Sequence, residues 1–217
     1  MKNKLVSFVI AFAIIISLLL GTNVSSATAG PLNSYQAALP NPGTIVPVPS
    51  KVYAKYSVGP HLSGFGMAYI TNKNKVTSSI DLGYSGQIVA PMTGRVAIVK
   101  SCGDHQIVFI IANRGADGYG WVIGLTHIWV NPKLDMQTVT KGQVIGKTVL
   151  PLAKPGKGCG YGSGMHIHYT LMKWNMGAKG PLYTEQNITN TYIGPWIVKN
   201  TYLDGATHDI KLGQLIK

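Results

Sequence analysis

The chain is poor in acidic residues and in helical patterns. Its 217 residues include 7 aspartates and glutamates against 19 lysines and arginines. After residue 29 no segment keeps an apolar period of about 3.6 residues, so a helical bundle is excluded. We also find no internal repeat, no pattern typical of a second domain, and no later apolar run of the ~20 residues that cross a bilayer. These absences favour one domain of short strands.

Two ligand signatures are also missing. Stacking aromatics interleaved with basic residues, or a basic helix, would indicate nucleic acid, and neither is present, so no nucleic-acid partner is expected. The glycine-rich stretch 154–164 is not a phosphate loop, because it lacks the Gly-Lys-Ser/Thr ending before a helix. We interpret this stretch either as a flexible rim beside an active groove or as a plain connector.

The amino terminus has the pattern of a secretory signal peptide. Lys2 and Lys4 precede an apolar run over residues 5–20, and the small residues 27–29 offer a cleavage site. We predict a signal peptide at 1–29, with an uncleaved membrane anchor as the alternative. After cleavage no stable membrane insertion is expected.

The rest of the chain alternates short apolar runs with turns. Residues 30–52 are rich in proline and predict a linker or short pro-segment outside the packed core, ahead of one main domain at 53–217. Strands are expected at 87–91, 95–100, 106–112, 121–128 and 144–149. The pattern predicts an all-β sandwich or folded barrel, to which the residues after 172 add strands or a flap.

Cysteine occurs only twice, as Cys102 and Cys159. Neither has a second cysteine nearby, which disfavours a Cys–His zinc site. An even number of cysteines in an exported chain favours one disulfide, which we predict between these two residues.

An H-x-H segment follows the glycine-rich stretch. Successive strand side chains point to opposite faces, so His166 and His168 share one face, and Ile167 and Tyr169 share the other. Two imidazoles on one rigid strand form half of a metal site or a catalytic pair. The alternative is two histidines on a half-buried face.

A single carboxylate stands in a short apolar strand. Asp81 lies between Ile80 and Leu82, where an isolated carboxylate would carry a large desolvation cost. A metal ion would stabilise it. Hydrogen bonds from backbone donors in a turn are the alternative.

The histidines are at positions 61, 105, 127, 166, 168 and 208. A hydrolytic zinc site takes three protein ligands and keeps one position for water. The chain offers His61, Asp81 and one histidine of the H-x-H pair as ligands. His127 and the other histidine of the pair remain for acid/base or oxyanion work. His105 and His208 have no motif partner and are interpreted as structural or surface residues.

Five motifs follow one another along the chain. They are S-S-I-D at 78–81, A-P-x-x-G-x-V at 90–96, T-H-I at 126–128, K-G-Q-x-I-G at 141–146 and G-x-G-M-H-I-H-Y at 162–169. In this order they resemble the lysostaphin-type (LytM-like) zinc metallopeptidases, over roughly residues 61–172. The resemblance implies an antiparallel folded sheet or sandwich in a single domain. It also implies a Zn²⁺ cofactor and hydrolysis of peptide bonds in bacterial peptidoglycan, with Gly-Gly links in cross-bridges as one candidate substrate.

The sequence departs from the family's commonest H-x-G-x-D pattern. Thr77 and Ser79 stand where that pattern has its first histidine and its glycine. A β-lytic, staphylolytic-protease-like branch instead places this histidine upstream, after a Gly-Pro or similar, and residues 59–61 fit that arrangement. The cysteine pair and residues 193–196 also resemble this branch. Tyr202 would match its tail tyrosine, which helps to stabilise the transition state.

The resemblance assigns a role to each residue of the constellation. It implies that His61, Asp81 and His168 bind zinc, while His127 and His166 stay unligated beside the attacking water. One histidine would accept the proton of the water and pass it to the leaving amine, and the others would stabilise the oxyanion.

Location and partners can be predicted as well. The resemblance implies that the protein's partners are bacterial peptidoglycan peptides, the predicted signal peptide implies secretion, and we expect a monomer. Without the predicted signal peptide the chain keeps 17 basic against 7 acidic residues, which fits either anionic wall polymers as a further partner or general solubility. The competing hypothesis is a catalytically silent relative that binds peptidoglycan and regulates another hydrolase.

Overall fold

The protein is described here by a computed structural model. It describes residues 43–65, 67–151, 159, 162–205 and 208–216. The predicted signal peptide at 1–29 and residues 30–42 of the predicted linker lie outside these residues.

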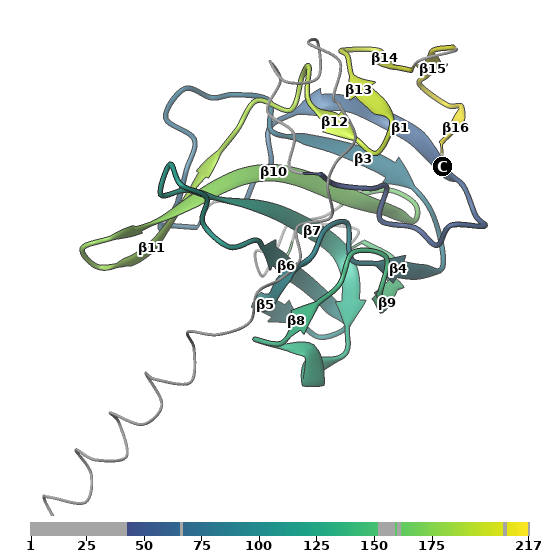
Figure 1. Cartoon of the computed structure of the whole chain (residues 1–217). Coiled ribbons are helices and arrows are strands. Elements are labelled where there is room, and N and C mark those ends of the chain that lie inside the picture. The colour runs from purple at the N-terminus through teal and green to yellow at the C-terminus, as the bar shows by residue number, and fades with distance from the viewer. Residues whose placement is uncertain (1–42, 66, 152–158, 160–161, 206–207, 217) are drawn as a thin grey trace, which may run out of the picture. The chain divides into compact units, whose positions relative to one another are not determined.

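Antiparallel β-sheet makes up almost all of the described fold (Figure 1). The main path of the large sheet runs β16 (Leu215–Ile216), β1 (Ala54–His61), β3 (Ser79–Gly83), β10 (His166–Gly177), β7 (Gly120–Val130), β6 (His105–Ile111), β5 (Gly94–Cys102) and β8 (Thr138–Val139). Off this path, β11 (Gly180–Glu185) pairs with β10 and β2 (Ile70–Thr71), while β9 (Val144–Thr148) pairs with β7 and β4 (Gln87–Val89). The β2–β11 pair is parallel, and the other pairs are antiparallel.

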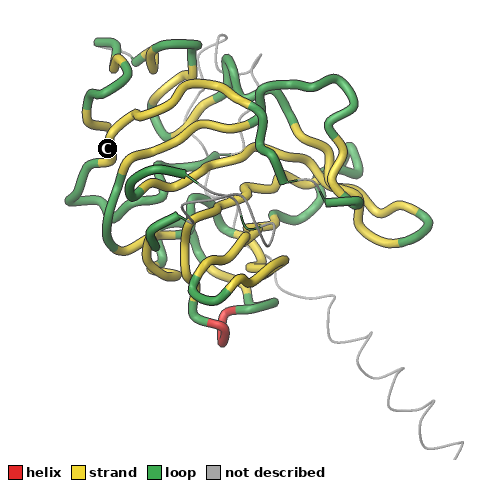
Figure 2. Tube along the Cα trace, turned by 180° about the vertical axis from the view of Figure 1, so that it is seen from behind, coloured by secondary structure: helices red, strands yellow, loops and turns green. Residues whose placement is uncertain are grey.

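A second, smaller sheet follows in the chain. Its order is β12 (Tyr192–Ile193), β13 (Trp196–Val198), β14 (Tyr202–Asp204) and β15 (Ile210–Lys211). Among the described residues the single helical element is the 3₁₀ turn η1 (Pro132–Leu134), visible as the short red segment in Figure 2. The all-β prediction is therefore confirmed, and the residues after 172 add strands as expected.

The β5–β6 hairpin illustrates how local sequence sets this fold. Cys102 pairs directly with His105, so Gly103 and Asp104 alone make the turn. Gly103 has a φ of 68°, a left-handed value that favours glycine and that two-residue hairpin turns require. The β-branched residues of the returning strand then fill the interior on both faces, and every residue of β6 is buried.

The two faces of the large sheet bury different apolar clusters. Ile167, Tyr169 and Leu171 of β10 belong to the main core, together with many residues of β3, β6 and β7. Met172 of the opposite face belongs to a smaller cluster that includes Phe65. The predicted alternation along β10 is confirmed, because Ile167 and Tyr169 are at most 1% exposed, whereas His166 and His168 line a pocket.

The segment before β1 differs from the expectation. Val46 and Val48 are each 4% exposed and belong to the main core. The backbone of Ile45 donates a hydrogen bond to the carbonyl of Pro91, and that of Val89 donates one to the carbonyl of Pro47. Residues 43–48 therefore pack onto the domain, because their alternating valines cover apolar surface that would otherwise contact water.

Candidate functional site

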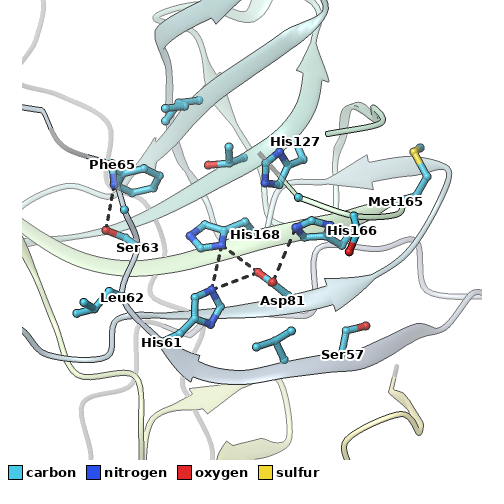
Figure 3. Close-up of a pocket in the computed structure, with 16 residues that line it drawn as sticks. Ser57, His61, Leu62, Ser63, Phe65, Asp81, His127, Met165, His166 and His168 are labelled. Carbon is cyan, nitrogen blue, oxygen red and sulfur yellow. Dashed lines mark hydrogen bonds and ion pairs between the residues drawn. The ribbon is translucent and has the colours of Figure 1, made fainter. Parts of the chain in front are cut away.

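A pocket of about 520 Å³ lies where β1, β3, β7 and β10 meet (Figure 3). Its lining consists of Ser57, Val58, His61, Leu62, Ser63, Gly64, Phe65, Asp81, Ile107, Thr126, His127, Gly162, Ser163, Met165, His166 and His168. The structure thus brings five of the six predicted metal and catalytic residues to one pocket. The sixth, Tyr202, begins β14 of the smaller sheet and is not among these lining residues.

Asp81 is the centre of the polar cluster in this pocket. Its Oδ1 lies 2.9 Å from His168 Nδ1 and 3.5 Å from His61 Nε2, and its Oδ2 lies 3.8 Å from His166 Nε2. Burial by itself would raise the pKa of the Asp81 carboxyl. The hydrogen bonds and charges of His168 and His61 outweigh burial and hold that pKa well below its usual range. Asp81 is therefore ionised, and the imidazoles of His168 and His61 are the partners that a carboxylate in an apolar strand requires.

β10 and β3 position His168 directly. His168 pairs with Asp81 across the two strands, and with Thr126 of β7 on its other side. Directly opposed residues of antiparallel strands share a face and lie within side-chain reach. The H-x-H strand therefore presents its second imidazole to Asp81 without any special loop.

His61 reaches the cluster through an irregular strand end. The β1–β3 pairing shifts register between Tyr56 and Val58, and again between Val58 and His61. Such bulges bend a strand and re-aim its side chains. The ring Nδ1 of His61 lies 2.8 Å from the carbonyl oxygen of Gly59, which can only accept a hydrogen bond, so Nδ1 carries the proton. In the neutral ring Nε2 then keeps its lone pair, and it lies 3.3 Å from His168 Nδ1.

Gly59 cannot be replaced without moving the backbone. A Cβ built on Gly59 would lie 2.1 Å from the carbonyl oxygen of Asn200. Real Cβ atoms do not approach backbone oxygens so closely, and only glycine allows this contact. The glycine of the Gly-Pro-His segment thus lets β1 pass close to residues before β14.

His127 stands at a bulge of β7. Gln106 pairs with Ile128 and Ile107 with Thr126, so His127 is the extra residue of its strand. Its φ is 62°, a left-handed value that is strained for a residue with a side chain. The bulge places its ring centroid 4.5 Å from that of His166. Burial, followed by the positive charge that His166 can carry, lowers the pKa of His127 to about 3. His127 is therefore neutral at neutral pH.

The donor atoms of His61, Asp81 and His168 suit a zinc ion. One candidate ligand atom from each lies within 4.8 Å of the others. Two imidazole nitrogens and one carboxylate oxygen form a ligand set typical of hydrolytic zinc sites. Around them, His127 Nδ1 and Thr126 Oγ1 are buried polar atoms without a hydrogen-bond partner in the described structure. Such orphaned atoms beside a cluster of donors are typical of a site that works on a bound group.

The remaining histidines do not enter the cluster. His105 is buried, and its ring centroid lies 6.2 Å from that of His127. His208 is exposed and packs its ring against Trp196, with 5.4 Å between the centroids. Neither lines the pocket, which agrees with their interpretation as structural and surface residues.

Two residues at the end of the glycine-rich stretch belong to the pocket. Gly162 and Ser163 line it, whereas residues 152–158 and 160–161 lie outside the described residues. A Cβ on Gly162 would lie 2.7 Å from Cε1 of His166, so this glycine leaves room for the ring. The predicted disulfide is confirmed, because Cys102 and Cys159 are joined. It ties the end of β5 to the segment that leads to this rim.

Sequence reasoning missed the wall of the pocket that follows His61. Phe65 is 8% exposed, and its ring centroid lies 5.9 Å from that of Phe109 and 6.1 Å from that of His168. A Cβ on Gly124 would lie 3.0 Å from the Phe65 ring, so that glycine leaves the space for it. An aromatic residue inside the glycine-bearing stretch after His61 was the one available signal.

Comparisons with known proteins give a structural match only. No family model matches the chain, and no curated protein matches it. Among solved structures, the M23 metalloprotease pseudoalterin from the deep sea is similar, with a TM-score of 0.54 and 16% identity over 80% of this chain and 96% of that one. The antimicrobial peptidase lysostaphin from Staphylococcus simulans matches with a TM-score of 0.35 and 15% identity, over 75% of each chain. The first match shows that the chain shares the fold of an M23 metalloprotease, and the second carries no argument.

Within the part of the chain that the structure describes, no helix has the length and hydropathy of a membrane span.

Proposed function

We propose that this protein is an exported zinc endopeptidase that hydrolyses peptide bonds of bacterial peptidoglycan. The observation that carries the proposal is the convergence of candidate ligand atoms of His61, Asp81 and His168 within 4.8 Å of one another, beside the paired imidazoles of His127 and His166. The M23 metalloprotease fold supports it. The specific placement in the β-lytic branch rests on the Gly-Pro-His segment and stays a prediction.

Zinc held by these three residues would lower the pKa of a bound water to roughly 7 and polarise the substrate carbonyl. The protein supplies the proton transfers. His127 is held neutral by burial, so the ring nitrogen that carries its proton can donate a hydrogen bond at neutral pH. His166 lies between His127 and Asp81, 3.8 Å from Asp81 Oδ2. In the proposal one of the two histidines moves the proton to the leaving amine, and the other donates to the developing oxyanion. Tyr202 is given no part, because it does not line the pocket.

We propose a substrate with small side chains at the cleaved bond. Phe65 and the consecutive residues 62–64 form one wall, and Gly162 and Ser163 lie on the side of His166. Glycine has no side chain to collide with such walls. Gly-Gly links in cross-bridges are therefore the substrate that we propose first.

Export and wall binding belong to the same proposal. The predicted signal peptide, the disulfide and the excess of 17 basic over 7 acidic residues in the rest of the chain support secretion into an anionic envelope. We propose that the enzyme acts as a monomer on peptidoglycan peptides, with anionic wall polymers attracting it.

Mass analysis of peptidoglycan fragments tests this proposal. Purified protein is incubated with peptidoglycan, with and without a chelator, and then with zinc restored. We expect peptide fragments that carry new amino termini, lost with the chelator and regained with zinc. A protein that binds one zinc and releases no such fragments would be the silent relative instead. Cleavage of glycan bonds would also contradict the proposal.

A further inference from the structure

A buried carboxylate outside the metal cluster is not explained by the proposed chemistry. Glu185, the last residue of β11, is 7% exposed. Removing a carboxylate from water is costly unless donors or cations replace the water. None of the ion pairs found among the described residues includes Glu185. Its stabilisation therefore comes from neutral hydrogen-bond donors.

Three side chains from separate segments donate to this carboxylate. The hydroxyl of Ser63 donates to Oε1. The hydroxyl of Ser78 donates to Oε2 at 2.6 Å, and the amide nitrogen of Asn72 donates to the same oxygen at 2.7 Å. Glu185 thus joins the segment after His61, the loop around Asn72 and the residue just before β3.

His61 depends on the hydrogen bond between Ser63 and Glu185 more than the other two candidate ligands do. His61 is the most exposed of the three candidate ligands, with 30% of its side chain accessible against 10% for His168 and 17% for Asp81. It is also the last residue of β1, beyond two register shifts. Strand pairing alone therefore fixes His61 less firmly than it fixes His168 or Asp81.

Ser63 lies two residues beyond His61 and lines the pocket. Its hydroxyl also accepts a long hydrogen bond of 3.5 Å from the backbone of Phe65. The hydrogen bond from Ser63 to Glu185 therefore restrains both His61, two residues before Ser63, and Phe65, two residues after it.

We propose that Glu185 is a positioning residue for the metal site. By holding Ser63 it fixes the segment 61–65, and this keeps the His61 imidazole beside Asp81 and His168. The inference rests on the proposed function for its zinc, and it adds a residue that touches neither metal nor substrate. Residues that orient metal ligands typically change metal affinity by 10- to 100-fold when they are lost.

Removing the Ser63 hydroxyl separates positioning from general stability. Ser63→Ala removes the bond to Glu185 and the long bond from the Phe65 backbone, both of which act on the His61 segment. Asn72→Ala removes the bond to Glu185 and two hydrogen bonds to the Val76 backbone within its own loop, and it leaves the His61 segment untouched. Zinc affinity is measured by competition with a chromophoric chelator, and thermal unfolding is measured on the zinc-free protein. We expect Ser63→Ala to raise the zinc dissociation constant roughly tenfold. Asn72→Ala should lower the unfolding temperature and leave zinc affinity within about twofold of the wild type.

Two further variants sharpen the test. Ser63→Thr keeps a hydroxyl and should retain wild-type affinity. Glu185→Gln keeps the size of the side chain but turns an acceptor into a donor that faces other donors. We expect it to weaken zinc binding at least as much as Ser63→Ala does. If Glu185→Gln fails to fold, Ser63→Ala still decides.

The outcomes distinguish the two proposals. Unchanged zinc affinity in Ser63→Ala, or an equal loss in Asn72→Ala, would overturn the positioning role and leave the endopeptidase proposal standing. A tenfold loss in Ser63→Ala, in a protein that never cleaves peptidoglycan, would support positioning and overturn the endopeptidase. A wild-type protein that binds no zinc would overturn both.

Discussion

The two faces of strand β10 perform opposite tasks, although they are made by alternating residues of one segment. Ile167, Tyr169 and Leu171 are at most 1% exposed and belong to the main core. On the other face, His166 and His168 line the pocket. Packing of the apolar face holds the strand rigid, and this fixes the backbone positions of His166 and His168 on the other face. The imidazoles are therefore positioned by packing on the opposite face of the strand, together with Phe65 on their own side.

The largest effect is expected from the polar face. His168→Ala removes one of three proposed ligands, so zinc and peptidase activity should be lost together, with activity falling by about 10³-fold or more. Metal analysis of the purified variant and a peptide-cleavage assay check this. Full zinc content in the variant would exclude His168 as a ligand.

A substitution on the apolar face should lower the free energy of unfolding and leave the zinc content unchanged. Leu171→Ala empties a fully buried position and should lower the free energy of unfolding by roughly 3 kcal/mol. Denaturant unfolding of the zinc-free protein measures the loss, while zinc content at saturation should stay at one ion. A loss of zinc without a loss of stability would contradict the division between the faces.

The two histidines of the same face should also differ from each other. His166→Ala should keep zinc and lose about 10²-fold in cleavage rate, because it removes an acid/base or oxyanion group and no ligand. His208→Ala, at an exposed position outside the pocket, is the matched control and should keep the full rate. If zinc disappears from His166→Ala, the roles of the two strand histidines are reversed.

The smallest effect concerns acid stability and His127. Its pKa falls from 6.5 to about 3 on folding, mainly through burial. The contribution of the neutral imidazole to the free energy of unfolding is therefore complete above pH 6.5. It is lost as the pH falls toward 3, because over this range the unfolded chain binds a proton at His127 and the folded chain does not. At pH 5 this loss is about 2 kcal/mol. His127→Asn, which tolerates the left-handed backbone, should unfold with a correspondingly weaker pH dependence when both zinc-free proteins are compared. Parallel pH profiles for the two proteins would contradict this contribution of His127.

Features set by local sequence could be predicted, and the motifs and the cysteine count also indicated two long-range features, the His61, Asp81 and His168 cluster and the Cys102–Cys159 disulfide. Features set by register shifts between strands could not be predicted. The alternation on β10 depends only on strand geometry, and the motif order indicated the fold. The ring orientation of His61 and the bulge at His127 depend on register shifts against β3 and β6, which no local pattern records. The burial of Val46 and Val48 was missed because prolines nearby indicated a linker. Glu185 was missed because its three donors are far away in the sequence.

Anomalous diffraction from crystals of the zinc-loaded protein tests the central claim most directly. The account predicts one zinc peak bonded to His61, Asp81 and His168, with a fourth position open to the pocket and with His127 and His166 unligated. A peak that lacks His61, or that recruits His166 in place of His168, would contradict it.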